Sequence, residues 1–105
     1  LAAHVARAPL PADVWRNLGR CVRRFHDAGV CHADLNVHNL LLDEGRRPWL
    51  LDFDRGRVRP QGGWRRDNLD RLLRSLRKLR TEQPDVHVQP ADWQALLDGY
   101  GQTSA

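Results

Sequence analysis

Two groups of polar residues flank a short hairpin pattern near the middle of the chain. The first group occupies residues 32–39 (HADLNVHN) and the second occupies residues 52–54 (DFD). Between them, the apolar runs 40–42 and 49–51 are separated by a turn cluster that contains Gly and Pro, a pattern typical of a β-hairpin. Antiparallel pairing of these runs would bring the end of the first group beside the start of the second. The chain must therefore adopt a fold that gathers distant polar residues around one site.

The chemistry of the two groups indicates phosphotransfer. The first has the pattern H-x-D-x-x-x-x-N, with Asp34 five residues before Asn39, and Asp52 follows Asn39 by thirteen residues. A carboxylate at Asp34 can orient an acceptor hydroxyl and take its proton. The oxygens of Asn39 and Asp52 are hard ligands that suit Mg²⁺ bridging nucleotide phosphates. We therefore predict an enzyme, an ATP- and Mg²⁺-dependent kinase with Asp34 as general base and Asn39 and Asp52 as metal and ATP-phosphate ligands. Without Asn39 and Asp52 in the sequence, Asp34 would be interpreted as a residue that caps a helix or a turn.

The residues between these fixed points narrow the prediction. Over residues 31–43 and 49–59 the chain closely resembles the 3-deoxy-D-manno-octulosonic acid (Kdo) kinases of Gram-negative bacteria, which belong to the lipopolysaccharide kinase family. The resemblance implies a protein-kinase-like enzyme that uses ATP to phosphorylate the Kdo sugar attached to lipid A. It also implies a cytoplasmic protein that is peripheral at the inner face of the bacterial inner membrane. In kinase-like folds the residue equivalent to His32 packs against the Phe of the magnesium loop, here Phe53, so His32 is expected to be structural.

Three positions leave alternatives open. His38 could face the phosphates or cap the loop. Asp54 stands where protein kinases have the Gly of D-F-G, as in the aminoglycoside and choline phosphotransferases, and could be a further metal ligand or pair with a neighbouring Arg. Ala33 replaces the Arg that would pair with a phosphorylated activation loop, so control by that switch is not expected.

The length of the chain permits only part of such an enzyme. At 105 residues it can bury one modest core, whereas a two-lobed kinase needs well over twice that length. It contains neither a glycine-rich phosphate loop nor a strand lysine in a V-A-I-K-like setting. We therefore expect residues 1–105 to form a single domain of class α+β, mostly α: a kinase-like C-terminal lobe with a catalytic-loop β-hairpin and without its N-terminal lobe. Alone it is expected to be incomplete and inactive.

Apolar periodicity predicts the helices around this core motif. A spacing of three and four residues begins after Asp13, a candidate N-cap, and ends at Gly29. Leucines at helical spacing over residues 69–79 predict a second helix, followed by a polar linker over residues 81–90. A short helix over residues 92–100 and a frayed tail over residues 101–105 complete the chain.

The chain is basic, with 17 Lys and Arg against 13 Asp and Glu and a net charge of +4. Part of this charge falls in residues 55–66, a loop without periodicity that contains Arg55, Arg57 and Arg59. Forked cations after the magnesium loop could bind the carboxylates and phosphates of a Kdo–lipid A acceptor or an anionic membrane surface. They could also form an ordinary solvated loop. Nucleic acid is not expected as a partner, because the aromatic residues fall at apolar positions and are not interleaved with Arg.

Other functional classes remain possible from the residues alone. An aminoglycoside- or choline-type phosphotransferase shares both motifs, although it usually has Gly at the position of Ala33. A kinase lobe without a nucleotide clamp could act as a non-catalytic binding module. A metal hydrolase could use His32, Asp34 and His38 as ligands.

Overall fold

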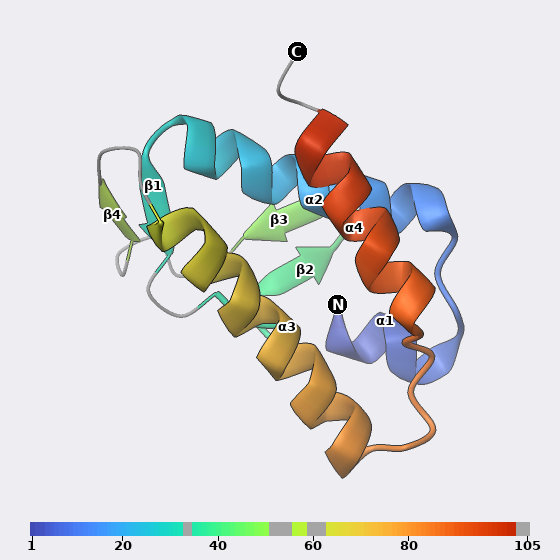
Figure 1. Ribbon diagram of the computed structural model, residues 1–105. Helices are drawn as coiled ribbons and strands as arrows, with labels where there is room; N and C mark the ends of the chain where they lie inside the picture. The colour runs from blue at the N-terminus through green and yellow to red at the C-terminus, as the bar shows by residue number, and fades with distance from the viewer. Residues whose placement is uncertain (33–34, 51–55, 59–62, 103–105) are drawn as a thin grey trace.

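The protein is mostly helical, with two small antiparallel sheets (Figure 1). The computed structural model describes residues 1–32, 35–50, 56–58 and 63–102. The elements in chain order are α1 (Ala2–Arg7), α2 (Ala12–Asp27), β1 (Val30–His32), β2 (Leu40–Leu42), β3 (Pro48–Leu50), β4 (Gly56–Val58), α3 (Trp64–Glu82) and α4 (Pro90–Gln102). The predicted class, α+β and mostly α, is confirmed.

Helix α2 begins one residue before the predicted cap. Pro11 occupies the N-cap position, and its carbonyl accepts the N–H of Val14 at 3.0 Å. Asp13 lies inside the first turn, where its carboxylate accepts a hydrogen bond from Arg16 at 2.6 Å, so its assignment as N-cap is wrong. An acidic residue in the first turn still favours the helix through the macrodipole. Gly29 follows the end of the helix with φ of 79°, as predicted, in a conformation that glycine adopts without steric cost.

Helices α2 and α4 pack backbone against backbone. A Cβ added at Gly19 of α2 would overlap the carbonyl oxygen of Leu96 and lie 2.7 Å from the nitrogen of Tyr100. A Cβ added at Gly99 of α4 would overlap the carbonyl oxygen of Arg16. Glycine at both positions therefore permits an approach that any other residue would block.

Helix α3 buries the predicted leucine stripe, with Leu72, Leu76 and Leu79 in the core. The segment after it differs from the predicted polar linker, because Val86 and Val88 are buried. The backbone N–H of His87 also donates to the carbonyl of Val5 at 2.7 Å and so ties this segment to α1. Two isolated valines in a polar stretch have no period, and only their contacts reveal that they are core residues.

Helix α4 extends beyond its predicted end. It continues through Gln102, so the first two residues of the expected frayed tail are helical. Residues 103–105 lie outside the described residues.

The predicted hairpin is confirmed by the pairing of β2 with β3. Leu40 pairs with Leu50, Leu41 with Trp49 and Leu42 with Pro48. Leu40 and Leu42 are buried while Leu41 faces outward, so the run of three leucines follows the two-residue alternation of a strand.

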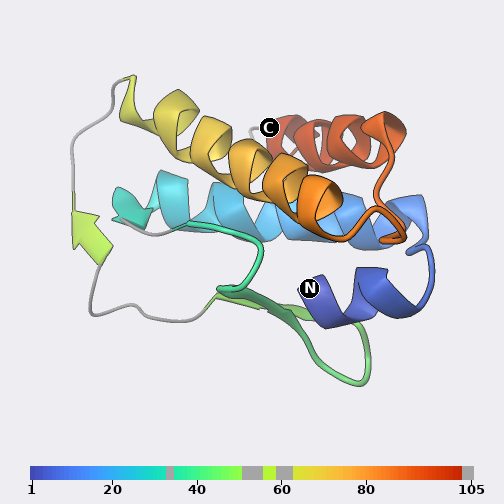
Figure 2. The same cartoon turned by 90° about the horizontal axis from the view of Figure 1, so that it is seen from below.

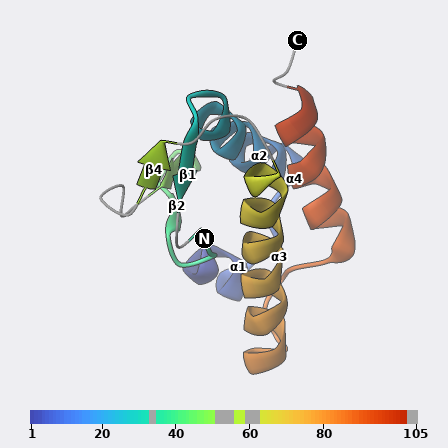
Figure 3. The same cartoon turned by 60° about the vertical axis from the view of Figure 1, so that its left-hand side comes forward.

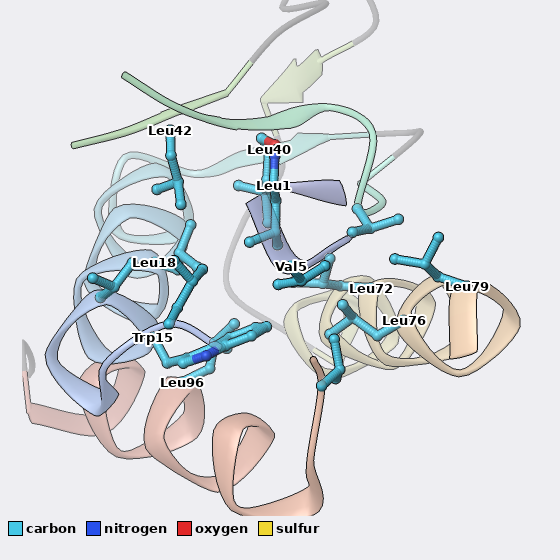
Figure 4. Close-up of a cluster of buried hydrophobic side chains, with 14 of the residues drawn as sticks. Leu1, Val5, Trp15, Leu18, Leu40, Leu42, Leu72, Leu76, Leu79 and Leu96 are labelled. Atoms are coloured by element: carbon cyan, nitrogen blue, oxygen red, sulfur yellow. Dashed lines mark hydrogen bonds between the residues drawn. The ribbon is translucent and has the colours of Figure 1, made fainter. Parts of the chain in front are cut away.

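The core lies where the helices meet the inner face of the β2–β3 hairpin (Figure 4). Figure 2 shows α2 in the middle, with α3 and α4 on one side and α1 and the hairpin on the other. Trp15 and Leu18 of α2 are fully buried at this meeting point, together with Leu96 of α4. Among the described residues, no helix is long and apolar enough to cross a membrane.

Candidate active site

The predicted site residues fall on the segment between α2 and α3. Asn39 and His38 are described in full, while His32 and Arg57 are described as backbone positions in β1 and β4. The other predicted site residues lie outside the described residues: Asp34, Asp52, Phe53, Asp54, Arg55 and Arg59. Their roles stay predictions, and the described residues establish how the flanking chain is held.

The segment that follows Asp34 is anchored in the core. Leu35 and Val37 are buried. The backbone N–H of Val37 donates to Oγ of Ser75 on α3 at 2.9 Å, and the Ser75 hydroxyl donates to the carbonyl of Leu72 at 2.7 Å. Two buried side chains and one hydrogen bond to α3 therefore fix the backbone immediately after the predicted base.

Asn36 shapes the turn that leads to Asn39. Its side-chain oxygen accepts the backbone N–H groups of His38 at 2.7 Å and Asn39 at 3.2 Å, and its carbonyl also accepts from Asn39 at 3.1 Å. This is the local side-chain-to-backbone pattern for which Asn is favoured in turns. Asn36 therefore caps this turn, and the His38 side chain is exposed. Both alternatives for His38 stay predictions.

Asn39 lies at the entry to the hairpin. It is partly buried and directly precedes Leu40, whose partner in the β2–β3 ladder is Leu50. The strand that leads toward Asp52 therefore ends beside the strand that starts after Asn39. The predicted approach of Asn39 to Asp52 agrees with this register, although Asp52 itself lies outside the described residues.

The outer face of the hairpin carries two exposed apolar side chains. Leu41 is 38% exposed and Trp49, directly opposite it, is 60% exposed. The indole N–H of Trp49 donates to Asp43 at 3.2 Å, and the backbone N–H of Arg47 donates to the same carboxylate at 2.9 Å. The hydrogen bond from the Arg47 backbone, more than that from Trp49, lowers the pKa of Asp43 below its ordinary value. We refer to Leu41 and Trp49 as the outer hairpin patch.

A strand absent from the sequence prediction joins the two ends of the candidate site. Residues 55–66 were expected to form a loop, but Gly56–Val58 form β4 and pair antiparallel with β1 (Figure 3). His32 is in register with Gly56, and Cys31 with Arg57. Three residues that include Gly and Arg are too few to show a strand period, so only the pairing with β1 identifies them as a strand.

A buried histidine that the sequence prediction missed lies at the end of α2, four residues before β1. His26, at the last turn of α2, is 1% exposed, and its ring contacts two other helices. Nε2 lies 2.9 Å from Oδ1 of Asn68 on α3, and Nδ1 lies 2.6 Å from the hydroxyl of Tyr100 on α4. Because the amide oxygen only accepts, Nε2 carries the proton in the neutral ring and Nδ1 accepts from Tyr100. Its position four residues after buried Val22 places it on the apolar face of α2, which is the signal that could have revealed it.

Burial lowers the pKa of His26 below its ordinary value of 6.5. The hydrogen bond to Asn68 opposes this shift, and the positive charges of Arg65 and Arg23 reinforce it. The carboxylate of Asp27 favours protonation of the ring and also opposes the shift. Together these effects lower the pKa of His26, so the neutral form of its imidazole is favoured.

Two arginines bind the carboxylate of Asp27, the residue that follows His26. Arg23 and Arg65 both donate to Oδ1 of Asp27, at 2.8 and 3.1 Å, and Arg65 also donates to the carbonyl of His26 at 2.7 Å. The hydrogen bonds from the two arginines hold the pKa of Asp27 below its ordinary value, with that from Arg23 the larger cause. We refer to His26 and Asp27 of α2, Asn68 and Arg65 of α3, and Tyr100 of α4 as the three-helix junction.

The described side chains contain no group of three or more His, Cys, Asp or Glu residues that could hold a metal ion. Asp34, Asp52 and Asp54 lie outside the described residues. The predicted magnesium site therefore remains a prediction.

Comparison with known proteins identifies the family. The model of the lipopolysaccharide kinase (Kdo/WaaP) family matches residues 1–100. The chain belongs to this family. The match extends from α1 through most of α4, so it includes the motif segment and the helices that carry the three-helix junction.

Several curated proteins are similar to this member of the lipopolysaccharide kinase family. The 3-deoxy-D-manno-octulosonic acid kinase of Photobacterium profundum is 43% identical over 94 residues, which cover 90% of this chain and 39% of the relative. A protein of the same name from Xylella fastidiosa is 56% identical over 87 residues, covering 82% and 34%. Another, from Stenotrophomonas maltophilia, is 55% identical over 76 residues, covering 71% and 30%. The chain thus spans between 30% and 39% of the length of these relatives.

Proposed function

We propose that this chain is the catalytic lobe of an ATP- and Mg²⁺-dependent kinase that phosphorylates Kdo attached to lipid A. The observation that carries the proposal is the match of residues 1–100 to the lipopolysaccharide kinase family, with relatives named as 3-deoxy-D-manno-octulosonic acid kinases. The H-x-D-x-x-x-x-N pattern begins at the last residue of β1 and ends at the residue before β2, within the matched region. An aminoglycoside- or choline-type phosphotransferase receives no comparable support.

In this proposal Asp34 acts on the acceptor. Its carboxylate orients a Kdo hydroxyl and takes the proton as the hydroxyl oxygen bonds to the γ-phosphorus of ATP, while the bond from that phosphorus to the β–γ bridging oxygen breaks and ADP leaves. The anchored backbone at Leu35 and Val37 supports a fixed position for the base, because positioning supplies much of the rate in this chemistry.

Asn39 and Asp52 would hold the magnesium ion, and Asp54 is a further candidate ligand. Their amide and carboxylate oxygens suit this hard cation, and the Leu40–Leu50 register supports the approach of the two chain segments. When bound, Mg²⁺ would offset the negative charge that develops on the phosphates during transfer.

The acceptor is proposed to bind along the segment that contains Arg55, Arg57 and Arg59. Lipid A phosphates and Kdo carboxylates are planar or tetrahedral anions that guanidinium groups bind in a forked manner. The register of Arg57 with Cys31, three residues before Asp34, supports a position near the base. The same cations and the net charge of +4 support peripheral binding to the anionic inner face of the bacterial inner membrane.

We further propose that a second, N-terminal lobe of the longer protein covers the outer hairpin patch. Two facing apolar side chains, Leu41 and Trp49, lie on the strand pair next to the proposed nucleotide ligands. A nucleotide clamp on a separate lobe would bury this patch. Its absence would leave a non-catalytic binding module, so residues 1–105 alone are expected to show no ATP-dependent phosphorylation of a Kdo–lipid A acceptor.

The test is phosphate transfer from radiolabelled ATP to a Kdo–lipid A acceptor by the longer protein. Asp34→Asn removes the base with minimal change in shape and should reduce kcat by about two orders of magnitude or more. Asp85→Asn is the matched control, because Asp85 is exposed in the connection before α4 and should leave kcat within about twofold of the parent. A kcat for Asp34→Asn within about threefold of the parent would show that Asp34 is not the base.

A further inference from the structure

All predicted site residues lie on the connection between α2 and α3, which we call the catalytic segment. It leaves the C-terminal end of α2, contains β1, β2, β3 and β4, and returns to the N-terminal end of α3 (Figure 1). Asp34, the predicted base, lies near the start of the catalytic segment, and residues 52–54, the predicted magnesium loop, lie before its last strand. The position of the predicted base relative to the predicted magnesium loop therefore depends on how the two ends of the catalytic segment are held.

The three-helix junction holds both ends together. His26 and Asp27 are the last two residues of α2, and Arg65 and Asn68 lie in the first turns of α3. Three bonds connect these ends: His26 to Asn68 at 2.9 Å, Arg65 to Asp27 at 3.1 Å, and Arg65 to the carbonyl of His26 at 2.7 Å. The entry and exit of the catalytic segment are thus joined across 42 residues of sequence.

Little flexible chain separates the junction from β1. The N–H of Gly29 donates to the carbonyl of His26 at 2.9 Å, and β1 begins at the next residue, Val30. Val30 pairs with Val58, so the β1–β4 ladder continues the connection that the junction begins. A shift at His26 would be transmitted directly to the strand that leads into Asp34.

A histidine suits this position because it makes two directional bonds to two different helices. Its ring is packed edge-on against Trp64, with centroids 5.0 Å apart, and against Tyr100 at 5.4 Å. An apolar ring of similar size could fill the space but could neither donate to Asn68 nor accept from Tyr100. Removing a buried partner leaves polar groups without that bond, which is more costly than the bond itself is worth.

We propose that His26 is a positioning residue for the phosphotransfer site, acting through Asn68 and Tyr100 to fix the entry of the catalytic segment against its exit. This role rests on the proposed kinase function. It holds β1, which leads toward Asp34, against β4, and it involves no contact with ATP or acceptor.

The kinetic test compares variants of the longer protein at saturating ATP and Kdo–lipid A acceptor. His26→Phe should reduce kcat about tenfold or more while KM for ATP changes less than about threefold, because misplacement of a base by about 1 Å affects the transition state more than binding. Tyr100→Phe keeps the ring and removes only one hydroxyl, so it serves if His26→Phe does not fold, with an expected loss of about threefold in kcat. Leu79→Ala is the matched control, because it destabilises the far end of α3 without touching the junction.

A second measurement follows the backbone without relying on catalysis. Hydrogen–deuterium exchange should become faster in peptides that contain β1 and β4 in His26→Phe and Tyr100→Phe, and should remain unchanged in peptides that contain β2 and β3. Leu79→Ala should not show this selective change.

The outcomes separate the two proposals. An inactive parent with selective exchange in the β1–β4 peptides would refute the kinase function and retain the junction as a clamp. An active parent whose folded His26→Phe or Tyr100→Phe variant keeps its kcat and its exchange pattern would overturn the positioning role. Equal losses of kcat in Leu79→Ala, at equal loss of stability, would overturn it as well.

Discussion

Replacement of Gly99 by Ala should destabilise the protein even though it improves helix propensity. Alanine in a helix interior is favoured over glycine by about 1 kcal/mol. At Gly99, however, the new Cβ would overlap the carbonyl oxygen of Arg16 and lie 2.6 Å from its carbonyl carbon, whereas ordinary contacts begin at 3.4 Å. The obstructing atoms belong to the α2 backbone and cannot rotate away, so the two helices must separate. Overpacking of this kind costs about 1–3 kcal/mol. With the cost near the upper end, we expect a net destabilisation of about 2 kcal/mol.

The assay is urea denaturation followed by far-UV circular dichroism, with the slope and midpoint fitted for each variant. Gly101→Ala is the matched control, because Gly101 lies two residues further along the same helix and an added Cβ there would meet nothing within 4 Å. This control should be neutral or stabilising by up to about 1 kcal/mol. The two variants should therefore differ in unfolding free energy by about 2–3 kcal/mol at similar slopes.

Equal stability of Gly99→Ala and Gly101→Ala would refute the close approach of α2 and α4. The complementary variant Gly19→Ala tests the same contact from α2, where the added Cβ would lie 2.7 Å from the nitrogen of Tyr100. Stabilisation by Gly19→Ala would contradict the packing independently.

Three further predictions follow from the buried and the proposed site residues. Because the pKa of folded His26 is lowered from 6.5, the unfolded chain takes up the proton first, and unfolding free energy should fall below pH 6.5 by up to about 1.4 kcal/mol per pH unit; His26→Gln should lack this fall, and an equal pH slope in the parent and His26→Gln would show that His26 is not its source. Asn39→Ala and Asp52→Ala should each raise the Mg²⁺ concentration for half-maximal activity of the longer protein, and their combined effect should be far from additive; an unchanged Mg²⁺ dependence in Asp52→Ala would contradict the metal assignment. Leu72→Ala, at a fully buried position, should cost about 2–5 kcal/mol in urea denaturation, whereas Leu73→Ala, at a partly exposed neighbour, should cost clearly less; similar costs would show that the stripe is not oriented as described.

The sequence by itself determined the elements whose signals are local. Apolar residues three and four apart predicted α2 and α3, because one face of each helix must be buried along its whole length. Two apolar runs around a turn cluster predicted the β2–β3 hairpin, and the motif spacing around it predicted the family to which the chain belongs. Gly29 marked the end of α2 because few other residues adopt its positive φ without strain.

Tertiary structure decided the features that depend on a distant partner. Strand β4 has no period of its own and is a strand because β1 supplies its hydrogen bonds. Val86 and Val88 resemble linker residues until they contact the core, and Gly19 and Gly99 resemble weak helix residues until α2 and α4 cross.

The three-helix junction shows the same limit most clearly. The sequence places His26 on the buried face of α2, but it does not reveal Asn68, 42 residues later, or Tyr100, 74 residues later, as its partners. A buried polar side chain is tolerated only where hydrogen-bonding groups meet it, and those groups are brought together by the packing of three helices. Periodicity specifies which face of a helix is buried, whereas the identity of the residue on the other side is fixed only when the chain has folded.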